Sequence, residues 1–350
     1  MKSIRQLFKN LFFVILVVSL FSSCNRKDNP VIQSNNWQTI YQNGDLDLFS
    51  IKFLDNNNGY VFAGLSPVHT APFWQLLLTT TDGGNHWTSD TCKLTAMIYG
   101  GIFPLNKEKI LGVGDHVYKS SNTGETWTDL TAQLPVGSRT FGSYIIDSLT
   151  WIFTRSGEIY RTINAGQTWQ LVYNISSGDI YENFTFPSSL VGYTSTGGIV
   201  MDFSVGGPGG SSGSIFKTTD GGQNWTVLNP EPWKSNGSTM PYLNALQFIT
   251  DQIGYIATYD SKLYKTVDGG NSWLLVHNNH YSNGLQHFIS EKIGYYSDGV
   301  TVYVTNDGGK TWTVDNYNDT QGSDILYWTF LESGQGYALT RDHRIIKNNF

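Results

Sequence analysis

The chain has 350 residues, of which 39% are hydrophobic and 14% are charged. This balance excludes a disordered chain, which would carry more charge and fewer apolar residues. The formal net charge of -6, with no Lys/Arg cluster beyond the first residues, argues against nucleic acid as a partner, because phosphate binding needs a basic face. Aromatic residues make up 14% and Gly accounts for 37 residues, so one large all-β domain with many turns is expected.

Residues 1–24 have the pattern of an export signal. Basic residues precede the apolar run Leu11–Phe21, and Ser22-Ser23-Cys24 follows it. The run is shorter than the ~20 residues that a membrane-spanning helix usually needs. The small residues before Cys24 resemble the lipobox of bacterial lipoproteins, although Phe21 stands where those proteins usually have Leu. We therefore expect export followed by lipidation of Cys24, with ordinary secretion or an uncleaved anchor as alternatives.

Residues 25–36 are polar and contain Pro30, so they are expected to form a flexible tether. If Cys24 is lipidated, Cys92 is the only other cysteine in the chain, and no intramolecular disulfide can form. Stability must then come from packing. Cys92 itself is expected to be a small buried side chain.

A repeat with the pattern Ser/Thr-x-Asp/Asn-x-Gly-x-x-Trp organises the rest of the chain. The intervals between successive copies match the length of one four-stranded propeller blade with variable loops. The Asp or Asn of the six copies is Asp82, Asn122, Asn164, Asp220, Asp268 and Asp307, and the Trp is Trp87, Trp127, Trp169, Trp225, Trp273 and Trp312.

Each copy is predicted to be the turn of a β-hairpin. A β-forming run ending in Lys or Arg precedes it, and the Trp opens a second such run. Gly accepts positive φ, and the Asp or Asn oxygen can bond backbone N–H groups two residues on. A second element, Gly-Tyr, is assigned to the turn between the first two strands of a blade. It occurs at Gly59-Tyr60, Gly192-Tyr193, Gly254-Tyr255, Gly294-Tyr295 and Gly336-Tyr337.

The last blade lacks its fourth strand. It starts near Asp324 and ends around Lys347, where another box should begin, while Trp37–Ile40 looks like the end of a box and its strand. We predict that this N-terminal strand completes the final blade, because closing the ring removes exposed sheet edges. The predicted fold is an all-β, seven-bladed β-propeller with Asp-box repeats over residues 37–350, its ring closed by the N-terminal strand.

Quoted as it stands, Thr218-Thr219-Asp220-Gly221-Gly222-Gln223-Asn224-Trp225 resembles the Asp-box (BNR) repeats of sialidases, sortilin-type receptors, xyloglucanases and the photosystem II stability and assembly factor family. The last family is closest in style, because its repeats combine Gly-Tyr with Lys-Thr-x-Asp-Gly-Gly-x-x-Trp. The resemblance covers essentially residues 37–350. It implies a propeller, and in that family the repeat serves an assembly factor. The box occurs in enzymes and non-enzymes alike, so it does not decide the function.

The boxes are expected to be structural and to lie away from the function. In an up-and-down blade with strands A to D, the A–B and C–D turns share one face of the disc, and the variable B–C and D–A loops share the other. We expect a ligand on the loop face, because loop residues carry most binding functions and aromatic rings grip sugars or peptides. The candidate contacts are Phe73, Trp74, Glu182, Trp233, Tyr242, His287 and Tyr327.

An enzyme is the alternative. A sialidase is not supported, because the chain has no Arg-Ile-Pro segment. A glycan-active hydrolase or lyase would pair two loop acids over the central channel. The spacing of His277, His280 and His287 does not match a helix-based zinc motif, and no glycine loop leads into a helix, so neither a metal nor a cofactor is expected. The candidate acids are Asp45, Asp47, Asp179, Glu182, Asp260, Asp298, Asp324 and Asp342.

The favoured interpretation is an exported, lipid-anchored, non-enzymatic propeller in the bacterial cell envelope, periplasmic or surface-facing. It would act as a scaffold for protein assembly or ligand binding. The expected partner is an envelope protein or an extracellular polysaccharide, with the membrane contacted through the lipid anchor only.

Overall fold

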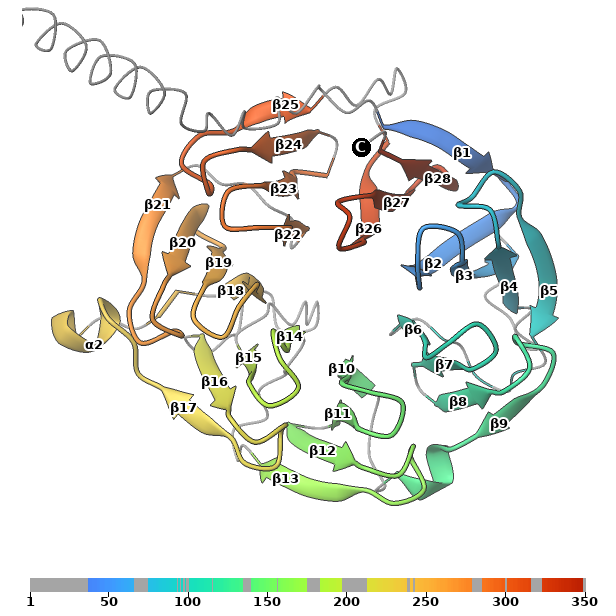
Figure 1. The fold of residues 1–350 in the computed structure, drawn as a ribbon, viewed down its shortest axis with the longest axis horizontal. Coiled ribbons are helices and arrows are strands. Elements are labelled where there is room, and N and C mark those ends of the chain that lie inside the picture. The colour runs from blue at the N-terminus through green and yellow to red at the C-terminus, as the bar shows by residue number, and fades with distance from the viewer. Residues whose placement is uncertain are drawn as a thin grey trace, which may run out of the picture. The chain divides into compact units, whose positions relative to one another are not determined.

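The structure, a computed structural model, describes residues 37–348 with gaps at 66–74, 93, 95, 97, 99–100, 115, 135–139, 156, 175–182, 197–212, 238–239, 242, 279–284, 300 and 316–322. All of these residues belong to one unit, Asn35–Phe350. In the described residues, 28 strands form seven four-stranded antiparallel sheets arranged in a ring (Figure 1). The predicted seven-bladed β-propeller is therefore confirmed.

Within each blade, strand A lies nearest the axis of the ring and strand D forms the rim (Figure 1). Blade one is β2 (Leu46–Phe53), β3 (Gly59–Leu65), β4 (Gln75–Thr80) and β5 (Thr88–Cys92). Blade two is β6 (Gly101–Pro104), β7 (Ile110–Val113), β8 (Val117–Ser120) and β9 (Trp127–Asp129). Blade three is β10 (Thr140–Ile145), β11 (Trp151–Arg155), β12 (Glu158–Thr162) and β13 (Gln170–Asn174). Blade four is β14 (Asn183–Thr185), β15 (Gly192–Thr196), β16 (Ser214–Thr218) and β17 (Thr226–Leu228).

The remaining blades follow the same order. Blade five is β18 (Leu243–Phe248), β19 (Gly254–Thr258), β20 (Lys262–Thr266) and β21 (Leu274–Asn278). Blade six is β22 (Gln286–Phe288), β23 (Gly294–Ser297), β24 (Val302–Thr305) and β25 (Thr313–Asp315). Blade seven is β26 (Ile325–Phe330), β27 (Gly336–Thr340), β28 (Arg344–Lys347) and β1 (Gln38–Gln42). Two short helices lie between blades: η1 (Thr131–Gln133) and α2 (Trp233–Asn236). In the part of the chain described, no helix has the length and apolarity to span a membrane.

The N-terminal strand closes the ring, as predicted. β1 pairs antiparallel with β28, with Gln38 opposite Lys347 (Figure 1). Just before β1, the Trp37 ring is buried, and its Nε1 donates a hydrogen bond to Asp315 Oδ2 on β25 at 3.1 Å. The first described residue of the chain thus ties blade seven to blade six, and β28 has no free edge.

The Asp boxes form the turns between strands C and D. In blade four, the Thr218 hydroxyl donates to Asp220 Oδ1 at 2.8 Å and accepts from the Gly222 N–H at 2.9 Å. Gly222 has a φ of 81°, and a Cβ there would lie 2.5 Å from Cδ1 of Ile152 in blade three. Only Gly allows both the positive φ and the close approach of Ile152. The turn therefore also packs one blade against the preceding one.

The boxes and the A–B turns share one face of the disc. In each blade with a box, a backbone N–H of the box donates to a carbonyl of the A–B turn, as Gly221 does to Leu190 O at 2.8 Å in blade four. We call this side, which carries the A–B turns and the boxes, the box face, and the opposite side the loop face. The topological expectation for the position of the boxes is confirmed.

The Gly-Tyr element was assigned wrongly to the A–B turn. Its two residues open strand B, and the Gly lies beneath a Phe ring from the end of strand A. In blade five, a Cβ on Gly254 would lie 2.8 Å from the Phe248 ring. The Tyr spans the boundary between blades, since Tyr193 donates its hydroxyl hydrogen to Asp251 O of blade five at 2.9 Å. The Gly-Tyr pair therefore contributes both to the packing within its own blade and to the contact with the next blade.

Cys92 is buried at the end of β5, as expected. Desolvation in this apolar cluster raises the pKa of its thiol to about 12. The thiol is therefore neutral at physiological pH and contributes packing.

Candidate functional site

Several predicted site residues lie outside the described residues, and their expected roles stay predictions. They are Cys24, Phe73, Trp74, Asp179, Glu182, Tyr242 and His280. The described candidates on which the loop-face hypothesis rested are Trp233, His287 and Tyr327.

Trp233 is buried, contrary to its interpretation as a ligand contact. It belongs to α2 in the connection between blades four and five, and it is only 8% exposed. Its ring packs edge-on against Tyr264 with 5.2 Å between centroids. Glu231 N donates to Asn271 O at 3.0 Å, so the connection folds back onto the box of blade five. Trp233 fills the space beneath this fold and presents no ring to a ligand.

His287 and Tyr327 lie on inner strands and not on loops. His287 is on β22, where its ring stacks on Phe330 with 4.7 Å between centroids and 6° between planes. Desolvation, together with the positive charge of Lys52, lowers the pKa of His287 to about 4, so the imidazole is neutral at pH 7. Tyr327 on β26 is 46% exposed and stays a candidate contact.

Loop acids proposed for glycan chemistry are engaged within their own hairpins or by a neighbouring strand. Asp260 Oδ2 accepts from Lys262 Nζ at 2.5 Å, and Asp342 Oδ2 pairs with Arg344 Nε at 2.8 Å. Further pairs are Asp47 with His343 at 3.4 Å, Asp298 with Tyr303 at 3.1 Å and Asp324 with Arg341 at 2.9 Å. These partners hold the carboxylates in local structure, and we find no support for a catalytic pair among them.

The histidine cluster expected from the sequence is divided between blades. His277 lies on β21, the rim strand of blade five, and His287 lies on an inner strand of blade six. Within the described ranges, no group of three or more His, Cys, Asp or Glu side chains is placed to hold a metal ion.

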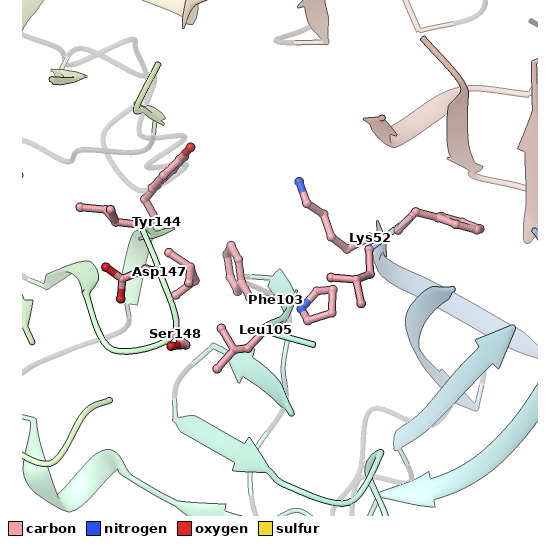
Figure 2. A pocket seen from close by; sticks show the side chains of 11 residues that line it. Lys52, Phe103, Leu105, Tyr144, Asp147 and Ser148 are labelled. Carbon is pink, nitrogen blue, oxygen red and sulfur yellow. The ribbon is translucent and has the colours of Figure 1, made fainter. Parts of the chain in front are cut away.

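A pocket of about 320 Å³ opens where the inner strands of blades one, two and three end on the box face. Its wall is formed by the ends of β2, β6 and β10 and by the A–B turns that follow them (Figure 2). Lys52 of β2 and Tyr144 of β10 stand on either side of Phe103 of β6 (Figure 2). The pocket therefore lies near the axis on the face opposite the one predicted to bind a ligand.

The pocket coincides with a departure from the repeat. Five blades pair a Phe at the end of strand A with the Gly that opens strand B, as Phe248 pairs with Gly254. Blades two and three instead pair Pro104 with Ile110 and Ile145 with Trp151. The Phe at the end of strand A is missing in these two blades, and it is their A strands that line the pocket together with β2.

The pocket combines apolar walls with one cation. Phe103, Leu105 and Ile145 supply aromatic and aliphatic surface. The Lys52 side chain makes no hydrogen bond or ion pair with any described residue. It is solvent-exposed, yet the surrounding strands displace much of its hydration, and this desolvation lowers the pKa of the ammonium.

The one carboxylate on the pocket wall is already occupied. Asp147 Oδ1 accepts hydrogen bonds from the N–H groups of Leu149 at 2.7 Å and Thr150 at 2.8 Å. Desolvation opposes ionisation of Asp147, but these hydrogen bonds outweigh it and lower the pKa of the carboxyl. Asp147 shapes the A–B turn of blade three and does not neutralise Lys52.

The family described as Photosynthesis system II assembly factor YCF48 matches residues 29–207 of the chain. The chain belongs to the YCF48 family. This finding agrees with the resemblance seen in the Asp boxes and the Gly-Tyr pairs.

Relatives and a solved structure extend this likeness over the rest of the chain. Photosystem II assembly lipoprotein Ycf48 of Prochlorococcus marinus (strain MIT 9313) is 24% identical over 351 aligned positions, covering 95% of each chain. The protein of the same name from strain MIT 9312 is 26% identical over 183 residues, 51% of this chain and 52% of the relative, so the chain spans about half of its length. A structure described as YCF48 bound to D1 peptide superposes with a TM-score of 0.65 at 18% identity, covering 91% of this chain and 98% of that one. At this identity the structural likeness shows the fold.

The pocket of this YCF48 family member was missed by sequence reasoning, although a signal for it existed. The predicted contacts are mostly aromatic residues assigned to the variable loops, whereas the pocket lies on the box face. The signal was the absence of Gly-Tyr in blades two and three, where Ile110-Leu111 and Trp151-Ile152 stand in its place.

Proposed function

We propose that this protein is an exported, lipid-anchored, non-enzymatic propeller that holds a segment of another envelope protein in the pocket formed by blades one to three. The observation that carries the proposal is the chemistry of this pocket: apolar walls beside the cation of Lys52, which has no partner among the described residues. Aliphatic and aromatic walls bind the side chains of a polypeptide, and one cation selects its charge and orientation. The names of the relatives, which are assembly lipoproteins, and a YCF48 structure with a bound peptide support a protein partner.

A protein partner fits the pocket better than a polysaccharide or a glycan substrate. Sugar hydroxyls are bound through several free hydrogen-bonding side chains. Most residues of this wall are Leu, Ile, Pro and Phe, and of its four side chains with polar groups Tyr144 already donates to Phe186 O at 3.3 Å. Two-carboxylate hydrolysis needs a second acid near the first. Asp147 is the only acid of the lining, and its oxygen is engaged by its own turn.

The lipid anchor would keep the propeller at a membrane surface. The lipobox-like segment ending at Cys24 supports it, as do the relatives named lipoproteins. A chain with Cys24→Ser should lose incorporation of radiolabelled palmitate and leave the membrane fraction. A Cys92→Ser chain is the matched control, and equal labelling of the two variants would rule out lipidation at Cys24.

The binding function can be tested with a photo-crosslinking residue placed in the full-length chain in its own cells. Ser148 lies on the pocket wall, and Ser333 occupies the equivalent position in the A–B turn of blade seven. Both side chains are exposed, so benzoylphenylalanine is tolerated at either position. We expect position 148 to form an adduct with a defined envelope protein, identified by mass spectrometry, and position 333 not to form it.

Binding of that purified partner then decides the proposal. Ser148→Trp fills the mouth of the pocket and should weaken binding to the full-length chain, measured by calorimetry. Ser333→Trp makes the same change in the A–B turn of blade seven, which contributes no residue to the pocket lining, and should leave the affinity unchanged. Equal adducts from positions 148 and 333, or full affinity in Ser148→Trp, would show that the pocket does not hold the partner.

A further inference from the structure

Exposed aliphatic side chains lie beside the pocket on the box face. Leu149 in the A–B turn of blade three is 54% exposed, Leu190 in the A–B turn of blade four is 60% exposed, and Ile163 in the box of blade three is 61% exposed. We call these three residues the aliphatic rim. Leaving them in water costs free energy that a partner would recover by covering them.

The repeat shows that the two leucines are particular to blades three and four and are not required by the turn, whereas Ile163 has an equally exposed counterpart in the box of blade five, Val267 at 61%. Leu149 and Leu190 are the fourth residues of five-residue hairpins whose ends are joined by the same backbone hydrogen bond in most blades. The equivalent residues elsewhere are Asn57, Glu108, Gln252, Lys292 and Gly334. Because the turn forms with polar residues or Gly at this position, the two leucines are not explained by folding.

The turns that carry the aliphatic rim are joined to one another by hydrogen bonds. Ala165 N donates to Leu149 O at 2.9 Å, which holds the box of blade three against its A–B turn. Arg161 Nε donates to Gly221 O at 2.8 Å, and Gly221 N donates to Leu190 O at 2.8 Å, so blade four continues the same surface. These hydrogen bonds, together with residues 161–165 of blade three, thus connect the turns that carry the two leucines across the boundary between the blades.

The rim is also continuous with the pocket. Asp147 and Ser148 line the pocket, and Leu149 follows them directly in the same hairpin. At the other end of the pocket stands Lys52, whose ammonium has no partner among the described residues. A ligand that covers the rim can therefore reach Lys52 without leaving the surface, and an unpaired cation beside apolar walls is complementary to a carboxylate.

We propose that the partner is an extended polypeptide segment bound in one direction, with a carboxylate on Lys52 near the axis and aliphatic side chains of the same segment over Leu149, Ile163 and Leu190. This inference rests on the proposed function, because it specifies the chemistry and direction of the segment held in that pocket. The carboxylate is an Asp or Glu side chain or the end of the partner chain.

The test selects short random peptides on the full-length lipidated chain in detergent. In one library the C-terminal carboxylate of the peptide is free. In the other the random sequence is internal to a longer chain, so that only side-chain carboxylates are available. The affinity of fluorescein-labelled selected peptides is then measured by anisotropy. We expect sequences that combine an acidic group with aliphatic residues, and roughly tenfold weaker binding to Lys52→Met, which keeps the length of the side chain but removes its charge.

Variants of the rim test the other end of the segment. Leu190→Glu should weaken binding roughly tenfold, since it removes apolar contact and adds a desolvated charge. Gln252→Glu is the matched control, because it places the same residue at the equivalent position of blade five. The double substitution Leu149→Ser/Leu190→Ser is a milder change that should also weaken binding. Thermal unfolding should show these three variants and Lys52→Met to be folded.

The outcomes separate the inference from the function on which it rests. Amide analogues of the selected peptides identify the source of the carboxylate: a C-terminal amide, or Asn and Gln in place of Asp and Glu, should remove the dependence on Lys52. Peptides that lose affinity for Ser148→Trp but bind Lys52→Met and Leu190→Glu normally would overturn the inference and leave the proposed function standing. Selection of no peptide, or binding that Ser148→Trp does not affect, would overturn both.

Discussion

The ring of Tyr193 lies flat on that of Phe248, with 3.4 Å between centroids and 2° between planes, and this contact joins blade four to blade five. The same stack joins Tyr255 to Phe288 and Tyr337 to Phe53, each at 3.5 Å. In each case the Phe also covers the Gly of its own blade. One aromatic ring thus fixes the packing within a blade and between blades.

Tyr193→Phe should lower the free energy of unfolding by about 1 to 2 kcal/mol. The substitution keeps the stacked ring but removes a hydroxyl that donates to Asp251 O at 2.9 Å and Gly269 O at 3.2 Å. Urea denaturation followed by tryptophan fluorescence measures the change. Tyr327→Phe is the control, because that ring is largely exposed, and equal losses in both variants would contradict a role for the contact between blades.

Gly222→Ala should destabilise the protein by roughly 2 to 4 kcal/mol, because the new Cβ meets Ile152 at 2.5 Å and the residue must keep a φ of 81°. Gly44→Ala should be nearly neutral, since a Cβ there has nothing within 4 Å. Thermal unfolding monitored by circular dichroism compares the two. A Tm for Gly222→Ala close to that of the wild type would mean that the box does not seat one blade on the preceding one.

Acid should destabilise the protein through His287. Its pKa falls from 6.5 in the unfolded chain to about 4 in the folded chain, so between these values the unfolded state binds a proton that the folded state does not. The contribution is fully present above pH 6.5, declines as the pH falls and is lost near pH 4, with a maximum of about 3 kcal/mol. Urea denaturation at several pH values tests this. His287→Gln should flatten the profile over this interval, and an unchanged slope would assign the acid sensitivity to other groups.

Lys52→Met should stabilise the protein slightly at pH 7, because it removes a charge that is partly desolvated and has no partner among the described residues. Lys347→Met should lower the free energy of unfolding, because the Lys347 amine donates to Gly83 O at 3.2 Å and lies over the Tyr337 ring. The same Lys52 variant should raise the pKa of His287, measured by NMR titration, because one cause of its depression is gone. A stability loss in Lys52→Met would mean that the folded protein supplies a partner for this ammonium.

The fold was predictable from the sequence because its signals are local and repeated. Each box needs Thr or Ser, Asp or Asn, Gly and Trp at fixed spacing, and the structure uses each of them within a few residues of chain. Closure by β1 was predictable for the same reason. Trp37 and the strand after it look like the end of a box, and the fourth strand of blade seven was the one strand that the repeats left unassigned.

The site was not predictable in the same way, because it arises from what two neighbouring blades lack. Pro104 and Ile145 look like ordinary strand residues when read singly. Their importance emerges only once the register aligns them with the Phe of the other blades. The prediction that Trp233 contacts a ligand was wrong for a different reason. Trp233 lies in an irregular connection, as a ligand contact often does, but that connection folds back over the box of blade five and buries the ring.

Ring closure by β1 has a mechanical consequence. If Cys24 is anchored as proposed, any pull between the membrane and the partner enters the propeller at Trp37, the start of the strand that holds the first and last blades together. Tension would then be borne first by the Trp37–Asp315 hydrogen bond and the pairing of β1 with β28. Detaching that strand would open the ring while the other six blades remain intact. The strength of the contacts that β1 makes with β28 and with Asp315 therefore sets the load that the tethered protein can carry.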